Sequence, residues 1–165
     1  MAMMIRLYLI VLCALLAMSG YAASLSDHSF ETVSISADEA SEDSDTDTLR
    51  FAGHFLMQSG EWNLQSHKAI VSGPPDRPER VFLQGSPARF LIERSADDQT
   101  QTIEATAPSI EYVRETNLLS LSGGASLRLN DEVIRSAAIE FDLSSDRYQS
   151  LGKGGVSIEV LPPAD

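Results

Sequence analysis

Histidines are the side chains of this sequence best suited to proton transfer or metal binding near neutral pH. They are His28, His54 and His67. Neither a tight His-x-His pair nor a supporting glutamate appears among them, so we do not expect these three to form a metal site. The acidic run from Glu42 to Asp47 could hold a hard cation loosely, but it lacks the glycine and the terminal glutamate of a calcium loop. We therefore interpret this run as a solvated loop and predict no metal site.

Motifs for phosphate binding and covalent catalysis give no better candidate. The segment Gly152–Gly155 reads GKGG, which has the wrong spacing for a phosphate-binding loop and is followed by no predicted helix. The sequence contains no Gly-x-Ser-x-Gly motif. Carboxylates are numerous, so a glycosidase pair on a jellyroll stays open as a remote alternative, but no pair stands out. We expect a protein without enzymatic activity and without a cofactor.

The first residues have the layout of a secretory signal peptide. Arg6 precedes an uncharged apolar run from Leu7 to Met18, and Gly20-Tyr21-Ala22 fits the small-x-small cleavage rule. As a helix the apolar run would span about 18 Å, at about 1.5 Å per residue, which is less than the roughly 30 Å of a bilayer core. We predict a signal peptide over residues 1–22, cleaved after Ala22 or Ala23, with a retained anchor as the alternative.

The mature chain over residues 23–165 is predicted to be one domain with a core of about residues 31–161. The only cysteine, Cys13, lies in the predicted signal peptide, so disulfides and cysteine-based sites are excluded from the domain. The formal net charge of the full chain is −12. A chain this acidic does not bind nucleic acid by bulk electrostatics.

Alternation of apolar and polar residues dominates from residue 31 to 161, without a helical stripe. It predicts an all-β, antiparallel fold in which sequence neighbours pair. The predicted loops are the acidic run 41–47, the proline-rich segment 73–79, and turns at 95–99, 114–117, 130–131 and 144–147. Pro108 is expected to break the strand that contains it, because proline has no N–H to donate.

A weak internal repeat runs through these strands. In each copy a strand reaches a glycine and a second strand follows; the glycines are Gly53, Gly85, Gly123 and Gly152. Such repetition indicates one strand-pair unit stacked on itself, with each copy covering the apolar face of its neighbour. A glycine inside a strand indicates a bulge or a bend in the sheet.

The hairpin from Arg50 to Val71, RFAGHFLMQSGEWNLQSHKAIV, carries a family resemblance. It matches without gaps the pattern Phe-x-Gly-x-apolar-x-apolar-x-x-Gly-x-apolar-x-apolar-x-small-x-x-apolar-x-Val. The matching positions are Phe51, Gly53, Phe55, Met57, Gly60, Trp62, Leu64, Ser66, Ala69 and Val71. The chain thus resembles the OstA-like family of periplasmic lipopolysaccharide-transport proteins over about residues 31–161.

The resemblance implies a V-shaped β-jellyroll of stacked strand pairs, open at both ends, whose apolar groove holds the acyl chains of lipid A. Alternation alone fits a dry sandwich core built from the same residues. The candidates for the groove are Phe51, Phe55, Met57, Trp62, Leu64, Val71, Phe90, Ile92, Ile103, Ile110, Tyr112, Leu119, Leu121, Leu127, Leu129, Ile134, Ile139 and Phe141.

The resemblance also implies partners at the two edge strands of the roll. An LptC-like inner-membrane subunit would pair with the N-terminal edge, through Val33 and Ile35, and an LptD-like outer-membrane protein with the C-terminal edge, through Val156, Ile158 and Val160. Head-to-tail self-association is a further expectation, and the protein would bridge the two membranes across the periplasm. The alternatives are a membrane-anchored LptC-like subunit and a β-sandwich adaptor without a lipid groove.

Two features depart from the family pattern. The acidic run 41–47 stands where the family has a tight turn, and the strong negative charge is unexpected for a protein that binds a phosphorylated lipid.

Overall fold

A computed structural model describes residues 32–43, 45–96 and 99–162, which belong to one compact unit over residues 31–165. This unit is all-β. No helix in the described ranges is long and apolar enough to cross a membrane. The predicted signal peptide lies outside the described residues.

Ten strands form a single antiparallel sheet. They are β1 (Val33–Ser36), β2 (Glu39–Asp43), β3 (Thr48–Ser59), β4 (Trp62–Ser72), β5 (Arg80–Ala96), β6 (Gln99–Val113), β7 (Leu118–Leu129), β8 (Glu132–Asp142), β9 (Arg147–Leu151) and β10 (Ser157–Val160). The order across the sheet is β1-β3-β4-β5-β6-β7-β8-β10, with β2 also paired to β3 and β9 also paired to β8. Neighbouring strands in the chain are thus neighbours in the sheet, as predicted from the short connections.

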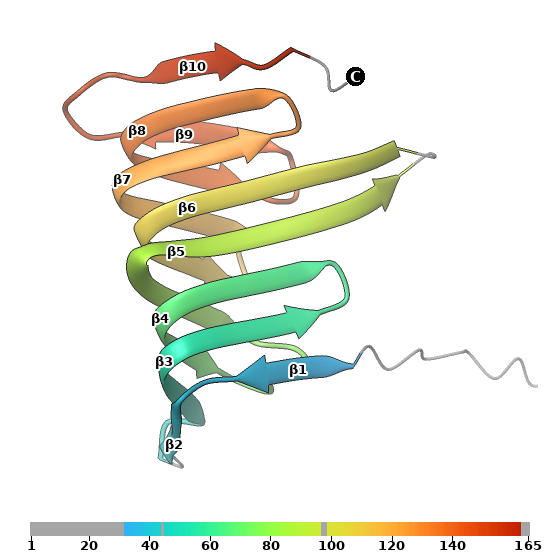
Figure 1. Cartoon of the computed structure of the whole chain (residues 1–165), viewed down its shortest axis with the longest axis vertical. Helices are drawn as coiled ribbons and strands as arrows, with labels where there is room; N and C mark the ends of the chain where they lie inside the picture. The colour runs from blue at the N-terminus through green and yellow to red at the C-terminus, as the bar shows by residue number, and fades with distance from the viewer. Residues whose placement is uncertain (1–31, 44, 97–98, 163–165) are drawn as a thin grey trace, which may run out of the picture. The chain divides into compact units, whose positions relative to one another are not determined.

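The six long strands bend near their middles, so the sheet folds over on itself into two leaves (Figure 1). The front leaf contains β1, 55–59, 62–65, 88–96, 99–107, 125–129, 132–136 and β10. The back leaf contains β2, 48–52, 68–72, 80–84, 109–113, 118–122, 138–142 and β9. We call the bent side the spine and the opposite side, where the strands turn, the mouth.

Irregular pairing at the spine produces the bend. The strand register shifts at Ala52/Phe55, Gln84/Ala88 and Ser122/Ala125, and each shift contains one of the repeat glycines: Gly53, Gly85 or Gly123. Gly53 has φ 71° and Gly123 has φ 91°, a backbone region that glycine enters without the steric cost of a Cβ atom. The interpretation of these three glycines as bulges is confirmed. Gly152 instead follows the end of β9.

Two predictions of local structure were wrong. The first part of the acidic run is β2, an edge strand that pairs with β3 from Glu39↔Ala52 to Asp43↔Thr48. Acidic side chains are tolerated there because the strand presents them to solvent while its backbone completes the back leaf. Pro108 does not break β6, which continues from Gln99 to Val113. The proline lies inside the register shift between Thr106 and Ser109, where no ladder hydrogen bond is needed.

Candidate functional site

The interior faces of the two leaves form one continuous apolar layer. Of the predicted groove residues, all are buried except Phe51, Trp62 and Leu129, which are half-buried against the same cluster. Phe55, Phe90 and Phe141 are at most 1% exposed, so solvent does not reach them between the leaves. The structure brings all the predicted residues together, from the first long strand to the last.

Sequence reasoning missed several members of this layer. They are Ala69, Val81, Leu83, Ala88, Ala105, Ala107, Ala125 and Leu143. Val81 and Leu83 alternate within RVFLQG and could have been found from that signal. The alanines next to the spine give no such signal, because small side chains are selected there by the close approach of the two leaves.

An aromatic cluster closes one part of the mouth. The Trp62 ring on β4 of the front leaf meets Tyr112 on β6 of the back leaf edge-on, with centroids 4.9 Å apart. Phe90 lies 5.1 Å from Trp62 and 6.1 Å from Tyr112. Burial raises the pKa of the Tyr112 hydroxyl above its ordinary value, an effect that the Arg114 and Arg94 guanidinium groups partly oppose.

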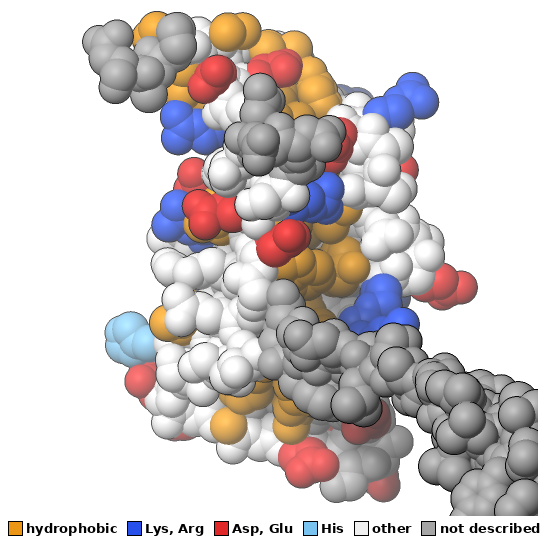
Figure 2. Space-filling model, turned by 90° about the vertical axis from the view of Figure 1, so that its right-hand side faces the viewer, with side chains coloured by type: hydrophobic (Ala, Val, Ile, Leu, Met, Phe, Trp, Pro, Cys, Tyr) orange, Lys and Arg blue, Asp and Glu red, His pale blue; other side chains and the backbone are white. Residues whose placement is uncertain are grey.

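Polar contacts cross the mouth farther along. Arg94 on the front leaf donates from Nη1 to the Leu143 carbonyl oxygen at 3.1 Å, and the same nitrogen lies 3.6 Å from Asp146 Oδ1. Gln101 Nε2 donates to Asp146 Oδ2 at 3.3 Å. Figure 2 looks into the mouth and shows hydrophobic side chains along it, with charged side chains of both signs beside them. The leaves are therefore joined at the mouth by polar as well as aromatic contacts.

One end of the interior layer remains exposed at β10, the C-terminal edge of the front leaf. Ile158, which pairs with the buried Ile134, is 54% exposed, and Val160 is 75% exposed. Val156 lies just before β10 and is also exposed. An ion pair of 2.9 Å between Arg135 and Glu159 attaches β10 to β8.

At the other edge of the front leaf, Val33 and Ile35 on β1 are half-buried and pack against the cluster. The predicted edge residues thus lie on or beside the two edge strands of this leaf.

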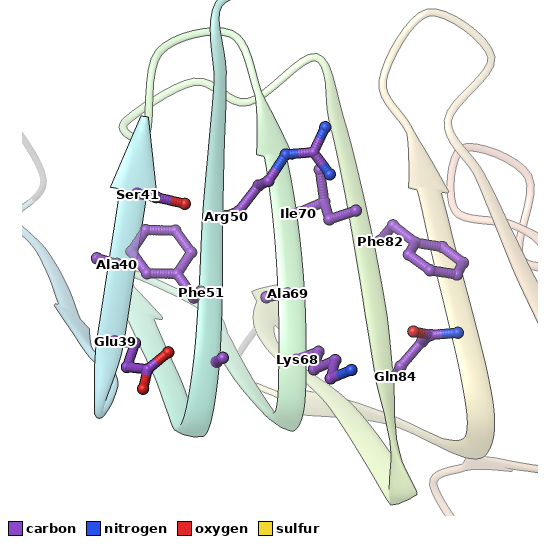
Figure 3. A pocket seen from close by; sticks show the side chains of 11 residues that line it. Glu39, Ala40, Ser41, Arg50, Phe51, Lys68, Ala69, Ile70, Phe82 and Gln84 are labelled. Atoms are coloured by element: carbon purple, nitrogen blue, oxygen red, sulfur yellow. The ribbon is translucent and has the colours of Figure 1, made fainter. Parts of the chain in front are cut away.

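The outer face of the back leaf carries a separate depression of about 290 Å³ over β2, β3, β4 and β5. Figure 3 shows Ser41, Arg50, Ile70 and Phe82 along one side of it, and Glu39, Lys68 and Gln84 along the other. Arg50 Nη2 lies 3.9 Å from Asp43 Oδ2. Phe51 and Ala69 of the interior layer also line the depression, but its other side chains lie on the outer face of the strands.

The described histidines have no place in the interior. His54 is exposed on the bulge of β3, and its Nδ1 lies 2.7 Å from Asp38 Oδ2. His67 is exposed as well, and His28 lies outside the described residues.

Comparison with known proteins gives the family. A family model described as "LptA/(LptD N-terminal domain) LPS transport protein" matches residues 34–147. The chain belongs to this family. The OstA-like family predicted from the hairpin motif is thereby confirmed.

Relatives in the LptA/LptD N-terminal family match nearly the whole chain. The lipopolysaccharide export system protein LptA of Escherichia coli K12 is 23% identical over 163 residues, which cover 97% of this chain and 86% of the relative. LptA of Shigella flexneri matches to the same extent.

A solved structure has the same fold. The crystal structure of LptH from Pseudomonas aeruginosa, the LptA-homologous periplasmic component of a lipopolysaccharide transport device, superposes with a TM-score of 0.69. It is 16% identical and covers 80% of this chain and 96% of its own. The predicted all-β jellyroll is therefore confirmed.

Proposed function

We propose that this protein is a periplasmic carrier of lipopolysaccharide that holds the acyl chains between its two leaves and passes the lipid along a bridge from the inner to the outer membrane. The observation that carries the proposal is the apolar interior, which runs without interruption from β3 to β8 and is lined by the residues predicted for the groove. Membership of the LptA/LptD N-terminal family supports it.

Binding of this kind needs apolar surface and no catalytic group. Each CH₂ group moved out of water contributes about 0.8 kcal/mol, so several acyl chains can be held by burial alone. Thr48 is the one polar residue among the buried side chains of the described ranges. The sugars and phosphates of the lipid would therefore stay outside, and we infer that the protein acts as a binding protein rather than an enzyme.

Transfer between proteins would use the edge strands. The unpaired backbone groups of β1 and β10 can extend the front leaf into another subunit by strand addition. The exposed Ile158 and Val160 would then be covered by the continuing apolar layer of the partner. We propose an LptC-like subunit at β1, an LptD-like protein at β10, and further copies of this chain between them.

Photo-crosslinking in cells tests the lipid site. A photoreactive phenylalanine analogue replaces Phe55 or Leu64 on the inner face, and Gln58 or Gln65 on the exposed outer face of the same strands serves as the control. We expect crosslinks to lipopolysaccharide from the inner pair only. Folded protein that gives no crosslink from either inner position would rule out the carrier and leave a β-sandwich adaptor.

Two further measurements separate the related alternatives. N-terminal sequencing of the protein recovered from the periplasm should give a start near Ala23; an intact N-terminus would favour the anchored LptC-like subunit. Depletion of the protein should cause lipopolysaccharide to accumulate at the inner membrane.

A further inference from the structure

The interior that we propose for the acyl chains is closed in this conformation. Leu64, Phe90 and Phe141 have no exposed surface, because side chains of the two leaves pack directly against each other. A packed core has no room for an additional chain of methylene groups. If the proposed function holds, on which this inference rests, the leaves must separate before lipid enters. The spine is covalently continuous, so they separate at the mouth.

The side chain of Arg94 connects the two leaves at the mouth. It follows Phe90 and Ile92 in the alternation of β5 and therefore points inward, at the end of the strand nearest the mouth. Its side chain is 29% exposed, so its charge is partly withdrawn from water. It reaches the back leaf through the Leu143 carbonyl and the Asp146 carboxylate.

The turn that receives Arg94 is held in place by its own hydrogen bonds. Asp142 accepts hydrogen bonds from the backbone N–H and the hydroxyl of Ser144, at 2.8 and 2.5 Å, and from the hydroxyl of Ser145, at 2.8 Å. The Leu143 N–H donates to the Asn117 carbonyl at 2.9 Å. The Leu143 oxygen and the Asp146 carboxylate are thus presented from a rigid turn, which reduces the entropy lost when the contact with Arg94 re-forms.

We propose that Arg94, with Gln101 beside it, is the latch that controls entry of lipid into the interior. In the closed state these side chains hold the β8–β9 turn of the back leaf against the front leaf. Lipid entry requires that the contacts of Arg94 with Leu143 and Asp146 break. Arg94, Asp146 and Gln101 lie partly in solvent at the rim, so water replaces the hydrogen bonds that their side chains lose and the opening costs little.

The chain supplies a matched control for Arg94. Arg89, also on β5, makes a 2.8 Å ion pair with Glu104 of the adjacent β6 in the same leaf. This pair has similar chemistry but does not cross the mouth. Trp62 is the only tryptophan of the chain and lies at the mouth against Tyr112, so its fluorescence reports the opening directly.

The first experiment locks the latch. Gln101→Cys and Asp146→Cys are introduced together into the full chain carrying Cys13→Ser, and a short bismaleimide with a reducible bond joins the two thiols. Binding of fluorophore-labelled lipopolysaccharide is then measured before linking, after linking and after reduction of the linker. We expect linking to lower the affinity for lipopolysaccharide at least tenfold and reduction of the linker to restore it.

The second experiment weakens the latch. Arg94→Ala should increase acrylamide quenching of Trp62 and accelerate lipopolysaccharide binding about fivefold, an effect in the range expected for the net loss of one ordinary hydrogen bond. Arg89→Ala should leave both unchanged. The linked protein retains Arg94, so the first experiment does not depend on how Arg94→Ala folds.

The outcomes distinguish the latch from the proposed function. If the unlinked protein binds lipopolysaccharide and the linked protein binds it equally well, the latch is wrong and the carrier stands. If the unlinked protein binds no lipopolysaccharide, both are overturned. A purely stabilising role for Arg94 would lower the unfolding temperature without any effect of the reversible link on binding.

Discussion

At the scale of single residues, the bulge of β3 both bends the strand and holds the segment that connects β1 to β2. Gly53 and His54 both have positive φ, 71° and 45°. The Asp38 N–H donates to the Gly53 carbonyl at 2.9 Å, and the Asp38 carboxylate meets His54. A Cβ atom at Gly53 would collide with this carboxylate. Glycine is therefore required both for the backbone bend and for the connection between β1 and β2.

Asp142 is the described carboxylate whose protonation has the clearest structural consequence. Its hydrogen bonds from Ser144 and Ser145 lower its pKa from 3.8 to about 2. A lowered pKa means that the folded state gains stability from the ionised group above the unfolded pKa. This gain is lost as the pH falls from about 4 to about 2.

We predict that Asp142→Asn, which cannot ionise, is less stable than the wild type at pH 5 and that the difference shrinks on acidification towards pH 2.5. Urea unfolding of both proteins across this range, followed by circular dichroism, measures the two free energies of unfolding. A difference that stays constant over the range would contradict the role given to the carboxylate.

Residue types in sequence were enough to predict most of the interior but not the latch. Phe55, Leu64 and Phe90 follow the alternation of their strands, and alternation depends only on local geometry. The contact between Arg94 and Leu143 joins residues 49 positions apart in the chain. It depends on how far the sheet bends at the spine, and the order of polar and apolar residues does not contain this information.

At the scale of elements, the sequence predicted the long strands and failed where charge or proline opposed strand formation. β2 reads EASED and has no apolar alternation to reveal it. It forms because the first half of β3 offers unpaired backbone groups, and pairing them does not depend on side chains. Pro108 fits into β6 because it lies in the register shift at the spine. At that position the pairing with the neighbouring strand needs no N–H donor, which proline lacks.

The exposed C-terminal edge leads to a prediction about β10. Ile158→Lys should abolish concentration-dependent self-association, because a lysine at an edge strand opposes the addition of another apolar strand. Ile158 is already 54% exposed, so the free energy of unfolding should change by no more than about 0.5 kcal/mol. Sedimentation velocity at increasing protein concentration, together with urea unfolding, measures both quantities.

Gln65→Lys is the control for this prediction, since it adds the same charge to the exposed outer face of the central strand β4. It should leave self-association intact. If the two variants associate equally well, β10 is not the edge through which copies join.

At the scale of the whole unit, one buried cluster extends across β3 to β8. We predict that the stacked strand pairs unfold together and not one by one. Leu127→Ala on β7 should cost about 2–5 kcal/mol, because it leaves a cavity in a fully buried layer. The fluorescence of Trp62, which lies on β4, should shift to the same denaturant midpoint as the circular dichroism.

Leu91→Ala, at a half-buried position on the outer face of β5, should shift both midpoints less. If Leu127→Ala moves the circular dichroism midpoint but not the midpoint of Trp62 fluorescence, the repeats unfold as separate units. Solenoid proteins can unfold in this way, because each repeat is stabilised only by its own contacts and those with its neighbours.

The predicted signal peptide would have the chain threaded through an export channel with its amino terminus first. The order of strands in the sheet has a consequence for how such a chain folds. Every strand pairs with partners at most two positions away in the chain, so each pairing closes only a short loop. The sheet can grow vectorially, each emerging strand adding to the edge left by its predecessor. The last edge left is β10, and strand addition by a partner protein would continue the same growth with another chain.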